Sequence, residues 1–170
     1  VLAGGGSSLV TDEAGEPVTG LQPTTWPGPM KYHPSAPLAF IRPLAEKATF
    51  DPGTDPAAAA KAAAGADVAI VFVTKWAAES FDTPDLSLPD GQDALAAAVA
   101  KANPHPVAVP ETNRPVKMPW LDRVGAAPPA CHPGSAAGEA PPPLLHGHAA
   151  PAGRPPLRWP TAYAHLPRPL

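Results

Sequence analysis

Aromatic side chains, cysteine, excess positive charge and long apolar runs are all scarce in this 170-residue sequence. Its one cysteine, Cys131, excludes a disulfide within the chain, and an isolated cysteine is more often a small apolar residue than a nucleophile. Lys and Arg number 12 against 15 Asp and Glu, so the basic stripe typical of nucleic-acid binding is missing. No apolar run approaches the roughly 18 residues of a membrane span. We therefore expect no nucleic-acid partner and no membrane span.

Proline is present in excess. The chain has 28 prolines, whereas average usage would give about eight or nine. Residues 128–170 hold 12 of them. Because proline fixes φ and lacks a backbone N–H donor, this segment cannot form a regular helix or a central strand throughout. The apolar content of 44% overstates the apolar area available for a core, because much of it is alanine, which buries little area.

The first half of the chain alternates between helix and strand signals. We read residues 1–37 as a long loop, followed by a helix that Pro43 shortens and by a short strand over 48–50. Asp55 is placed to cap a helix that begins at Pro56 and ends at Gly65. The run DVAIVFV, residues 67–73, shows no polar alternation, which predicts a strand buried on both faces.

The same alternation continues in the second half. Asp90 is expected to cap a helix that Asn103 and Pro104 stop, and PVAVP is the next strand. A short helix around Trp120, a proline-damaged strand at GAAPPACHP and a last helix at GSAAGEAPPPLLHG complete the order. The pattern predicts the α/β class: a mostly parallel sheet flanked by helices, an α/β sandwich that is irregular in its C-terminal part.

Three features that resemble cofactor, metal or catalytic sites do not meet the requirements of such a site. A dinucleotide-binding pattern starting at Gly4 needs glycine where Leu9 stands, and we expect no strand before GGGSS. His146 and His148 lack further ligand-type residues at a useful spacing, and Glu139 reads as a solvated helix residue. We expect no cofactor and no metal.

An acidic loop follows the predicted buried strand. It reads WAAESFDTPDLSLP and carries Glu79, Asp82 and Asp85. Acidic loops are usually just solvated connections, but ligands of parallel sheets bind outside the carboxyl ends of the strands, where this loop lies. Close spacing on one loop does not direct the carboxylates of Glu79 and of Asp82 or Asp85 at opposite sides of a glycosidic bond. We therefore do not expect a complete catalytic pair within this chain.

Longer motifs give the sequence a family resemblance. In order they are GGGSSLV, TFDPGTDPAAAAKAA, ADVAIVFV, ESFDTPDLSLPDGQDALAAAVAKANP, VAVPET, PVKMPWLDRVGA, HPGSAAGEA and PAGRPPLRWP. Together they closely resemble the C-terminal α/β domain of family 3 glycoside hydrolases, the β-glucosidase family, over nearly the whole chain. The stretch from Glu79 to Leu95 is the most specific part of the match.

The resemblance implies a retaining, exo-acting β-glycosidase of two domains, with a β-glucoside-like carbohydrate as substrate. A (β/α)8 barrel, missing from this chain, supplies the Asp nucleophile, and Glu79 is the acid/base. Asp82 and Asp85 are then expected to support the loop by accepting backbone N–H bonds. Trp76 is either a platform for sugar stacking or a lid on the core. Related enzymes are often exported, which points to the periplasm or to secretion, but the sequence itself does not settle the compartment.

The chain also departs from the family pattern. By the family pattern a strand precedes GGGSS; we expect this strand to be missing here and the chain to be truncated at its start. We divide the chain into a long loop (1–37), an α/β core (38–124) and a proline-rich, degraded end of the domain (125–170), in which prolines are expected to remove helix and ladder bonds. A non-catalytic α/β scaffold or interaction module is the alternative function.

Overall fold

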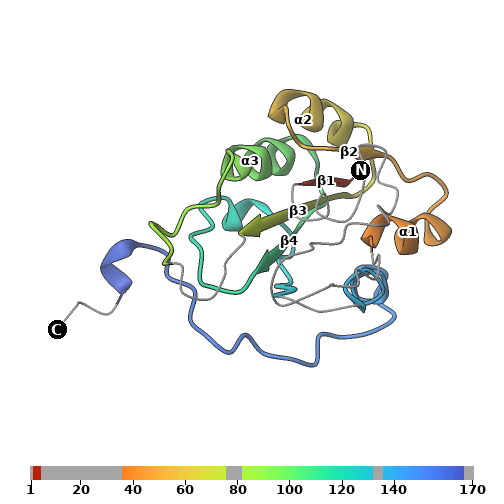
Figure 1. The fold of residues 1–170 in the computed structure, drawn as a ribbon. Helices are drawn as coiled ribbons and strands as arrows, with labels where there is room; N and C mark the ends of the chain where they lie inside the picture. Colours follow the sequence, from red (N-terminus) through yellow and green to blue (C-terminus); the bar gives the residue numbers. More distant parts are fainter. Residues whose placement is uncertain (1, 5–35, 76–81, 132–135, 167–170) are drawn as a thin grey trace, which may run out of the picture.

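The computed structural model describes residues 2–4, 36–75, 82–131 and 136–166. Its centre is a parallel sheet of four strands in the order β2-β1-β3-β4. The strands are β1 (Leu2–Gly4), β2 (Phe50–Asp51), β3 (Ala69–Lys75) and β4 (Pro106–Thr112). Figure 1 shows α2 and α3 together on one side of the sheet and α1 on the other. The predicted α/β class with a mostly parallel sheet is confirmed.

Strand β3 is buried on both faces, as the unbroken apolar run predicts. Successive strand residues point to opposite faces, and those of β3 enter two separate cores. Val71 and Val73 pack in a core with helices α2 (Pro56–Ala64) and α3 (Gln92–Ala102). Ile70 and Phe72 pack in the other core, with residues of α1 (Pro37–Ile41) and α4 (Pro141–Leu145).

The expectation that the first strand is missing is wrong, as is the expectation that no strand precedes GGGSS. β1 pairs in parallel with both neighbours, since Leu2 lies opposite Phe50 of β2 and Ile70 of β3. Three residues give no periodic signal, so the sequence pattern could not reveal this strand. The backbone of β1 lies between two others, which supply its hydrogen-bond partners.

One predicted helix cap is confirmed and the other is wrong. Asp55 has extended backbone angles and accepts a hydrogen bond from the N–H of Ala57 at 2.8 Å. Asp90 instead has a positive φ of 55°, and α3 begins after Gly91, whose φ is 72°. Capping requires an extended residue directly before the helix, and two successive left-handed residues take Asp90 out of that position.

Asn103 ends α3 and ties it to α2. The residue is buried, and its Nδ2 donates to the carbonyls of Ala63 and Ala66 at 2.8 and 2.7 Å. Its Oδ1 accepts the N–H of His105 at 2.8 Å. These bonds tie the end of α3 to the last turn of α2 and to the residues that follow it.

The predicted strand PVAVP forms the larger part of β4, and its prolines do not break the pairing with β3. The strand runs from Pro106 to Thr112, and Pro110 lies opposite Val73. On the edge away from β3, Ala108 donates to the carbonyl of Ala126, and the carbonyl of Pro110 accepts from Ala130. Because Pro110 has the same orientation as Ala108, its nitrogen also faces away from β3, so no bond of that ladder is lost.

The C-terminal part is irregular, as predicted. Among the described residues after Thr112, the regular elements are helical and short: η3 (Leu121–Arg123), α4 and η5 (Tyr163–His165). The stretch GAAPPACHP contributes a single bridge, from Ala126 to Val107, in place of a strand. The helix after Pro37 ends at Ile41 and continues as a 3-10 turn (η2, Arg42–Leu44) around Pro43. No described helix has the length and apolar character needed to cross a membrane.

Candidate functional site

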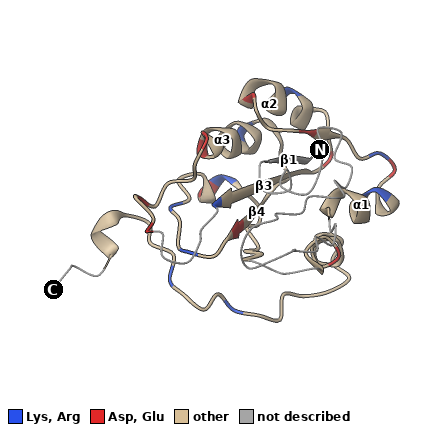
Figure 2. Cartoon of the chain, viewed as in Figure 1, with Lys and Arg blue, Asp and Glu red and all other residues tan. Residues whose placement is uncertain are grey.

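The candidate site lies where β3 and β4 end. The segment that follows β3 carries Trp76 and Glu79, which lie outside the described residues, and then Asp82 and Asp85, which are described. Residues 82–91 return from this edge of the sheet to the start of α3. Figure 2 marks charged residues of both signs here.

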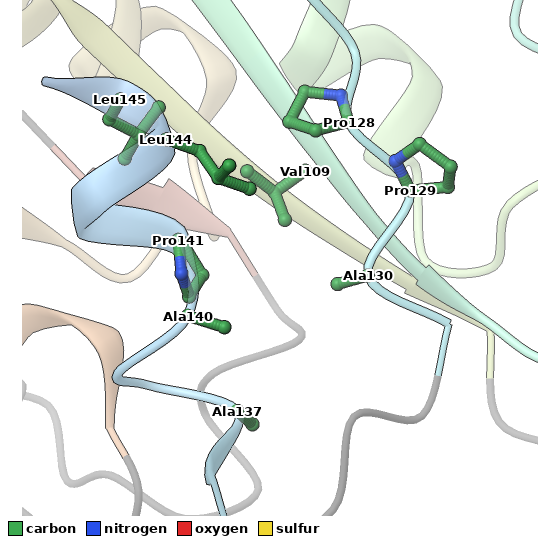
Figure 3. A pocket seen from close by; sticks show the side chains of 9 residues that line it. All are labelled: Val109, Pro128, Pro129, Ala130, Ala137, Ala140, Pro141, Leu144 and Leu145. Carbon is green, nitrogen blue, oxygen red and sulfur yellow. The ribbon is translucent and has the colours of Figure 1, made fainter. Parts of the chain in front are cut away.

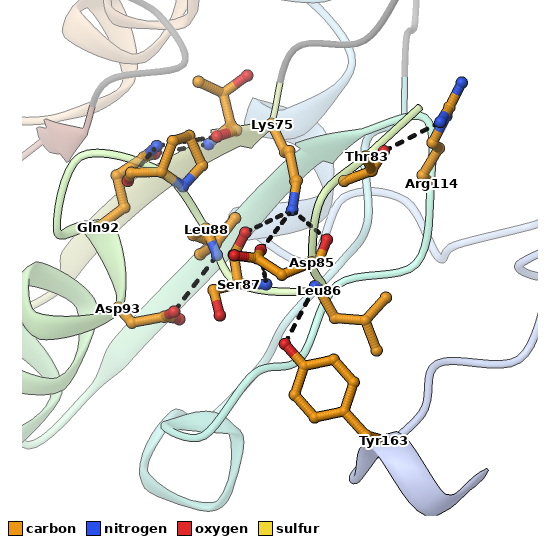
Figure 4. Close-up of polar contacts among 12 residues, drawn as sticks. Lys75, Thr83, Asp85, Leu86, Ser87, Leu88, Gln92, Asp93, Arg114 and Tyr163 are labelled. Atoms are coloured by element: carbon orange, nitrogen blue, oxygen red, sulfur yellow. Dashed lines mark hydrogen bonds and ion pairs between the residues drawn. The ribbon is translucent and has the colours of Figure 1, made fainter. Parts of the chain in front are cut away.

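Lys75, the last residue of β3, is buried and binds the returning chain (Figure 4). Its Nζ donates to the carbonyl of Asp85 at 2.7 Å and to the carbonyl of Ser87 at 2.6 Å. It also lies 3.3 Å from Oδ1 of Asp85. A buried ammonium needs such partners, since an unpaired buried charge is very costly.

The carboxylate of Asp85 completes a tight turn. Its Oδ1 accepts the N–H of Ser87 at 2.8 Å, an interaction within the loop that Asp favours in turns. This backbone hydrogen bond, with a further contribution from the Lys75 ammonium, lowers the pKa of Asp85 below its usual value. The side chain is half exposed, so its ion pair with Lys75 is screened by solvent.

A second set of bonds joins the start of α3 to β3. The side chain of Gln92 accepts the N–H of Thr74 at 2.7 Å and donates to the Thr74 carbonyl at 2.8 Å. Asp93 accepts bonds from the N–H of Leu88 and from Nε1 of Trp120, the latter at 2.9 Å. The loop is therefore held to the sheet, to α3 and to the buried indole of Trp120.

The chain after β4 contacts the outer side of the loop. Arg114 donates to Oγ1 of Thr83 at 3.0 Å, and the N–H of Lys117 donates to the carbonyl of Leu86 at 2.8 Å. The Leu86 N–H lies 3.4 Å from the hydroxyl of Tyr163, whose ring lies 4.3 Å below the Lys117 ammonium. The loop is thus held from two sides, by Lys75 at the end of β3 and by residues of the chain after β4.

Asp82 differs from Asp85. It is exposed, and among the described residues we find no hydrogen-bond partner for its carboxylate. The two aspartates for which the sequence predicts the same supporting role therefore have different surroundings. That role remains a prediction for Asp82.

Glu111 is a carboxyl group at this edge that the sequence analysis did not identify. It is the next-to-last residue of β4, and its carbonyl accepts a bond from Oγ1 of Thr74 at 3.1 Å. Burial raises the pKa of Glu111 to about 7. The signal in the sequence was a glutamate directly after the predicted strand PVAVP, at the same end of the sheet as the acidic loop.

A cavity of about 210 Å³ lies on the face of the sheet that carries α1 and α4, between Val109 of β4 and the C-terminal segments (Figure 3). Its walls are Val109, three prolines, three alanines and the two leucines of α4, none of which has a polar side chain. It offers no side-chain hydrogen bonds to a sugar. Within the described residues, no group of three or more His, Cys, Asp or Glu is arranged to hold a metal ion.

Comparison with known proteins gives a consistent result. The family profile described as the C-terminal domain of glycosyl hydrolase family 3 matches residues 2–169. A β-glucosidase of Rhizobium radiobacter is 38% identical over 104 residues, which cover 59% of this chain and 12% of that protein. Probable β-glucosidase H of Neosartorya fischeri is 38% identical over 121 residues, 69% of this chain and 15% of that protein.

Solved structures agree. A β-glucosidase from Chaetomella raphigera superposes with a TM-score of 0.74 at 28% identity, over 94% of this chain and 26% of that one. DesR, a β-glucosidase from Streptomyces venezuelae in complex with D-glucose, gives a TM-score of 0.53 at 43% identity, over 55% of this chain and 12% of that one. The chain thus spans a small part of the length of the relatives that it matches.

Proposed function

The chain belongs to glycosyl hydrolase family 3, as its C-terminal domain, and from this we propose that it supplies the acid/base carboxyl of a retaining β-glycosidase. Glu79 is the proposed acid/base. The observation that supports the proposal is the position of the described residues on either side of Glu79 in the sequence: Lys75 ends the inner strand β3 at the carboxyl edge of the sheet, and its buried ammonium binds the carbonyls of Asp85 and Ser87. Ligands of parallel sheets bind at this edge.

The proposed chemistry needs two carboxyl groups. In a retaining glycosidase one carboxylate attacks the anomeric carbon, and a carboxylic acid about 5 to 5.5 Å away protonates the leaving oxygen and later activates water. Glu79 takes the second role. An Asp of a (β/α)8 barrel domain takes the first, as the family resemblance implies, so the pocket forms between two domains.

The proposed substrate is a β-linked glucoside or a similar sugar. The relatives are β-glucosidases, and one of them was solved with D-glucose. We propose Trp76 as a stacking platform for the sugar and Asp85 as a support for the loop. The bond from Ser87 N–H to Asp85 supports the second assignment.

The test joins the full 170-residue chain to the barrel of a family 3 β-glucosidase and compares Glu79→Ala with the parent fusion. Loss of general acid catalysis should slow substrates with poor leaving groups by about 10²- to 10⁴-fold. An activated aryl glucoside leaves without that proton, so its glycosylation step should change far less. Azide should attack the accumulated covalent intermediate and yield a β-glucosyl azide.

Matched variants make the assignment specific. Asp82→Ala and Asp85→Ala should show neither leaving-group dependence nor azide product. If Asp82→Ala shows both and Glu79→Ala shows neither, the acid/base is Asp82. The 170-residue chain alone should not hydrolyse aryl β-glucosides, because the covalent route needs the nucleophile. An active fusion that no carboxyl substitution in this chain affects would favour the non-catalytic scaffold.

A further inference from the structure

Lys75 connects two points of the chain that lie on either side of Glu79 in the sequence. We propose that Lys75 is a positioning residue for that carboxyl, because its ammonium fixes the start and the return of the segment to each other. This inference rests on the proposed function of Glu79. It assigns Lys75 no contact with the substrate.

The first part of the argument is the rigidity of the point from which Lys75 extends. The residue ends β3, which lies between β1 and β4 in the sheet, and it is opposite Thr112 of β4. Only 9% of Lys75 is exposed. Packing and backbone pairing on both sides of β3 therefore fix where the lysine stem begins.

The second part is the choice of acceptors. Two of the three contacts of the Lys75 Nζ are hydrogen bonds to main-chain carbonyls, to that of Asp85 at 2.7 Å and to that of Ser87 at 2.6 Å. A carbonyl moves only with its backbone, whereas an exposed carboxylate can rotate into solvent. The third contact, to Oδ1 of Asp85, reaches an atom that also accepts the Ser87 N–H. Lys75 therefore binds the turn as a unit.

The third part is that, among the described residues, Lys75 supplies the contacts that tie residues 82–87 to β3, whereas Arg114 and Lys117 tie Thr83 and Leu86 to the chain after β4. Gln92 ties the start of α3 to the backbone of Thr74, and Asp93 ties Leu88 to Trp120. Both anchor the chain after Ser87. Removal of the lysine ammonium should therefore loosen residues 76–87 and leave the docking of α3 intact.

Catalysis depends on this kind of restraint. A general acid must lie within about 2.6 to 3.2 Å of the atom that it protonates, and a misplacement of about 1 Å can cost 10²-fold in rate. Lys75→Met keeps most of the side-chain length and removes the ammonium. In the barrel fusion it should lower kcat for poor leaving groups by about tenfold to a hundredfold.

Two readouts separate positioning from a general loss of structure. In Lys75→Met the glycosylation step of activated aryl glucosides should stay close to the parent rate, because it needs no proton from Glu79, and azide should give no glucosyl azide, because the Glu79 carboxylate is still present. Amide hydrogen exchange of the full chain should speed up between residues 76 and 87 and stay unchanged in α3. Lys61→Met, which removes an exposed ammonium from α2, is the matched control and should change neither readout.

The outcomes are distinct. Unchanged exchange in residues 76–87 would overturn the restraint, and equal loss for good and poor leaving groups would overturn the positioning role. Either result leaves the proposed function standing if Glu79→Ala still shows leaving-group dependence with azide product. If Glu79→Ala shows neither, the proposed function fails and the positioning role fails with it.

Discussion

The unit from β3 to β4 and the chain from Gly125 to Leu166 both contain apolar residues and prolines, but they satisfy their backbone differently. Between Ala69 and Thr112, two strands and a helix pair nearly all of their main chain, and Pro110 sits in a strand without loss because its nitrogen faces away from β3. After Gly125 the described residues give one bridge and two short helices. Whether a proline removes a backbone hydrogen bond of the sheet therefore depends on the direction in which its nitrogen points.

Hydrogen exchange should show the largest difference between the two regions. Amides of β3, β4 and α3 should be protected at least about a thousandfold more than those between residues 149 and 162, because the former open only with the core. Exchange of the 170-residue chain, followed by mass spectrometry, measures both regions at once. Equal and strong protection would mean that the C-terminal region has a core of its own.

The same leucine truncation should have unequal effects. Leu95 of α3 is 2% exposed, and Leu95→Ala should lower the free energy of unfolding by about 2 to 5 kcal/mol. Leu144 of α4 is only partly buried and borders the apolar cavity, so Leu144→Ala should cost about 1 kcal/mol or less. Urea unfolding of both variants gives the comparison. A larger loss from Leu144→Ala would reverse the ranking of the two regions.

The pKa of Glu111 in β4 depends on the C-terminal region, because segments of that region cover the face of the strand on which it lies. Alternation along β4 places this residue on the face of Val109, which the C-terminal segments cover. Its pKa rises from 4.5 to about 7 on folding, so the folded state holds a proton that the unfolded chain releases. Stability should therefore be full below pH 4.5, fall as the pH rises toward 7 and level off above it.

Glu111→Gln should remove this dependence and raise stability at pH 8 by up to about 3 kcal/mol relative to the parent. Urea unfolding at several pH values tests it, with Glu139→Gln at an exposed site of the C-terminal region as the control. If the pH dependence survives in Glu111→Gln, the C-terminal segments do not shield this carboxyl as the structure indicates.

The smallest difference in stability is expected between an aspartate that caps a helix and one that does not. Asp55→Ala removes the bond to the Ala57 N–H and should cost about 1 kcal/mol. Asp122 also lies in a first turn, that of η3, but it is exposed and no side-chain cap is formed there. Asp122→Ala should change stability by less than about 0.5 kcal/mol. Similar costs for the two substitutions would show that the hydrogen bond of Asp55 to the Ala57 N–H contributes little to stability.

Prediction from sequence succeeded where one residue determines one local structure. Asp55 before Pro56 specified a cap, and the apolar run of β3 specified burial on both faces. It failed for β1, which is a strand because it pairs with the distant strands β2 and β3. It also failed for Asp90, because this residue and Gly91 have positive φ angles and Asp90 does not cap α3. The acidic loop was recognised from its carboxylates, but Lys75 and Glu111 became visible only when the strands brought their ends together.

The place of β1 in the sheet has a consequence for the order of folding. Residues 2–4 form an inner strand, yet Leu2 pairs with Phe50 and Ile70, which a ribosome adds much later. Contacts this distant in sequence slow folding, because loop closure must precede the pairing. During synthesis β1 can form its backbone pairs only after β2 and β3 have both left the ribosome. Residues 2–4 therefore join the sheet later than their position in the sequence suggests.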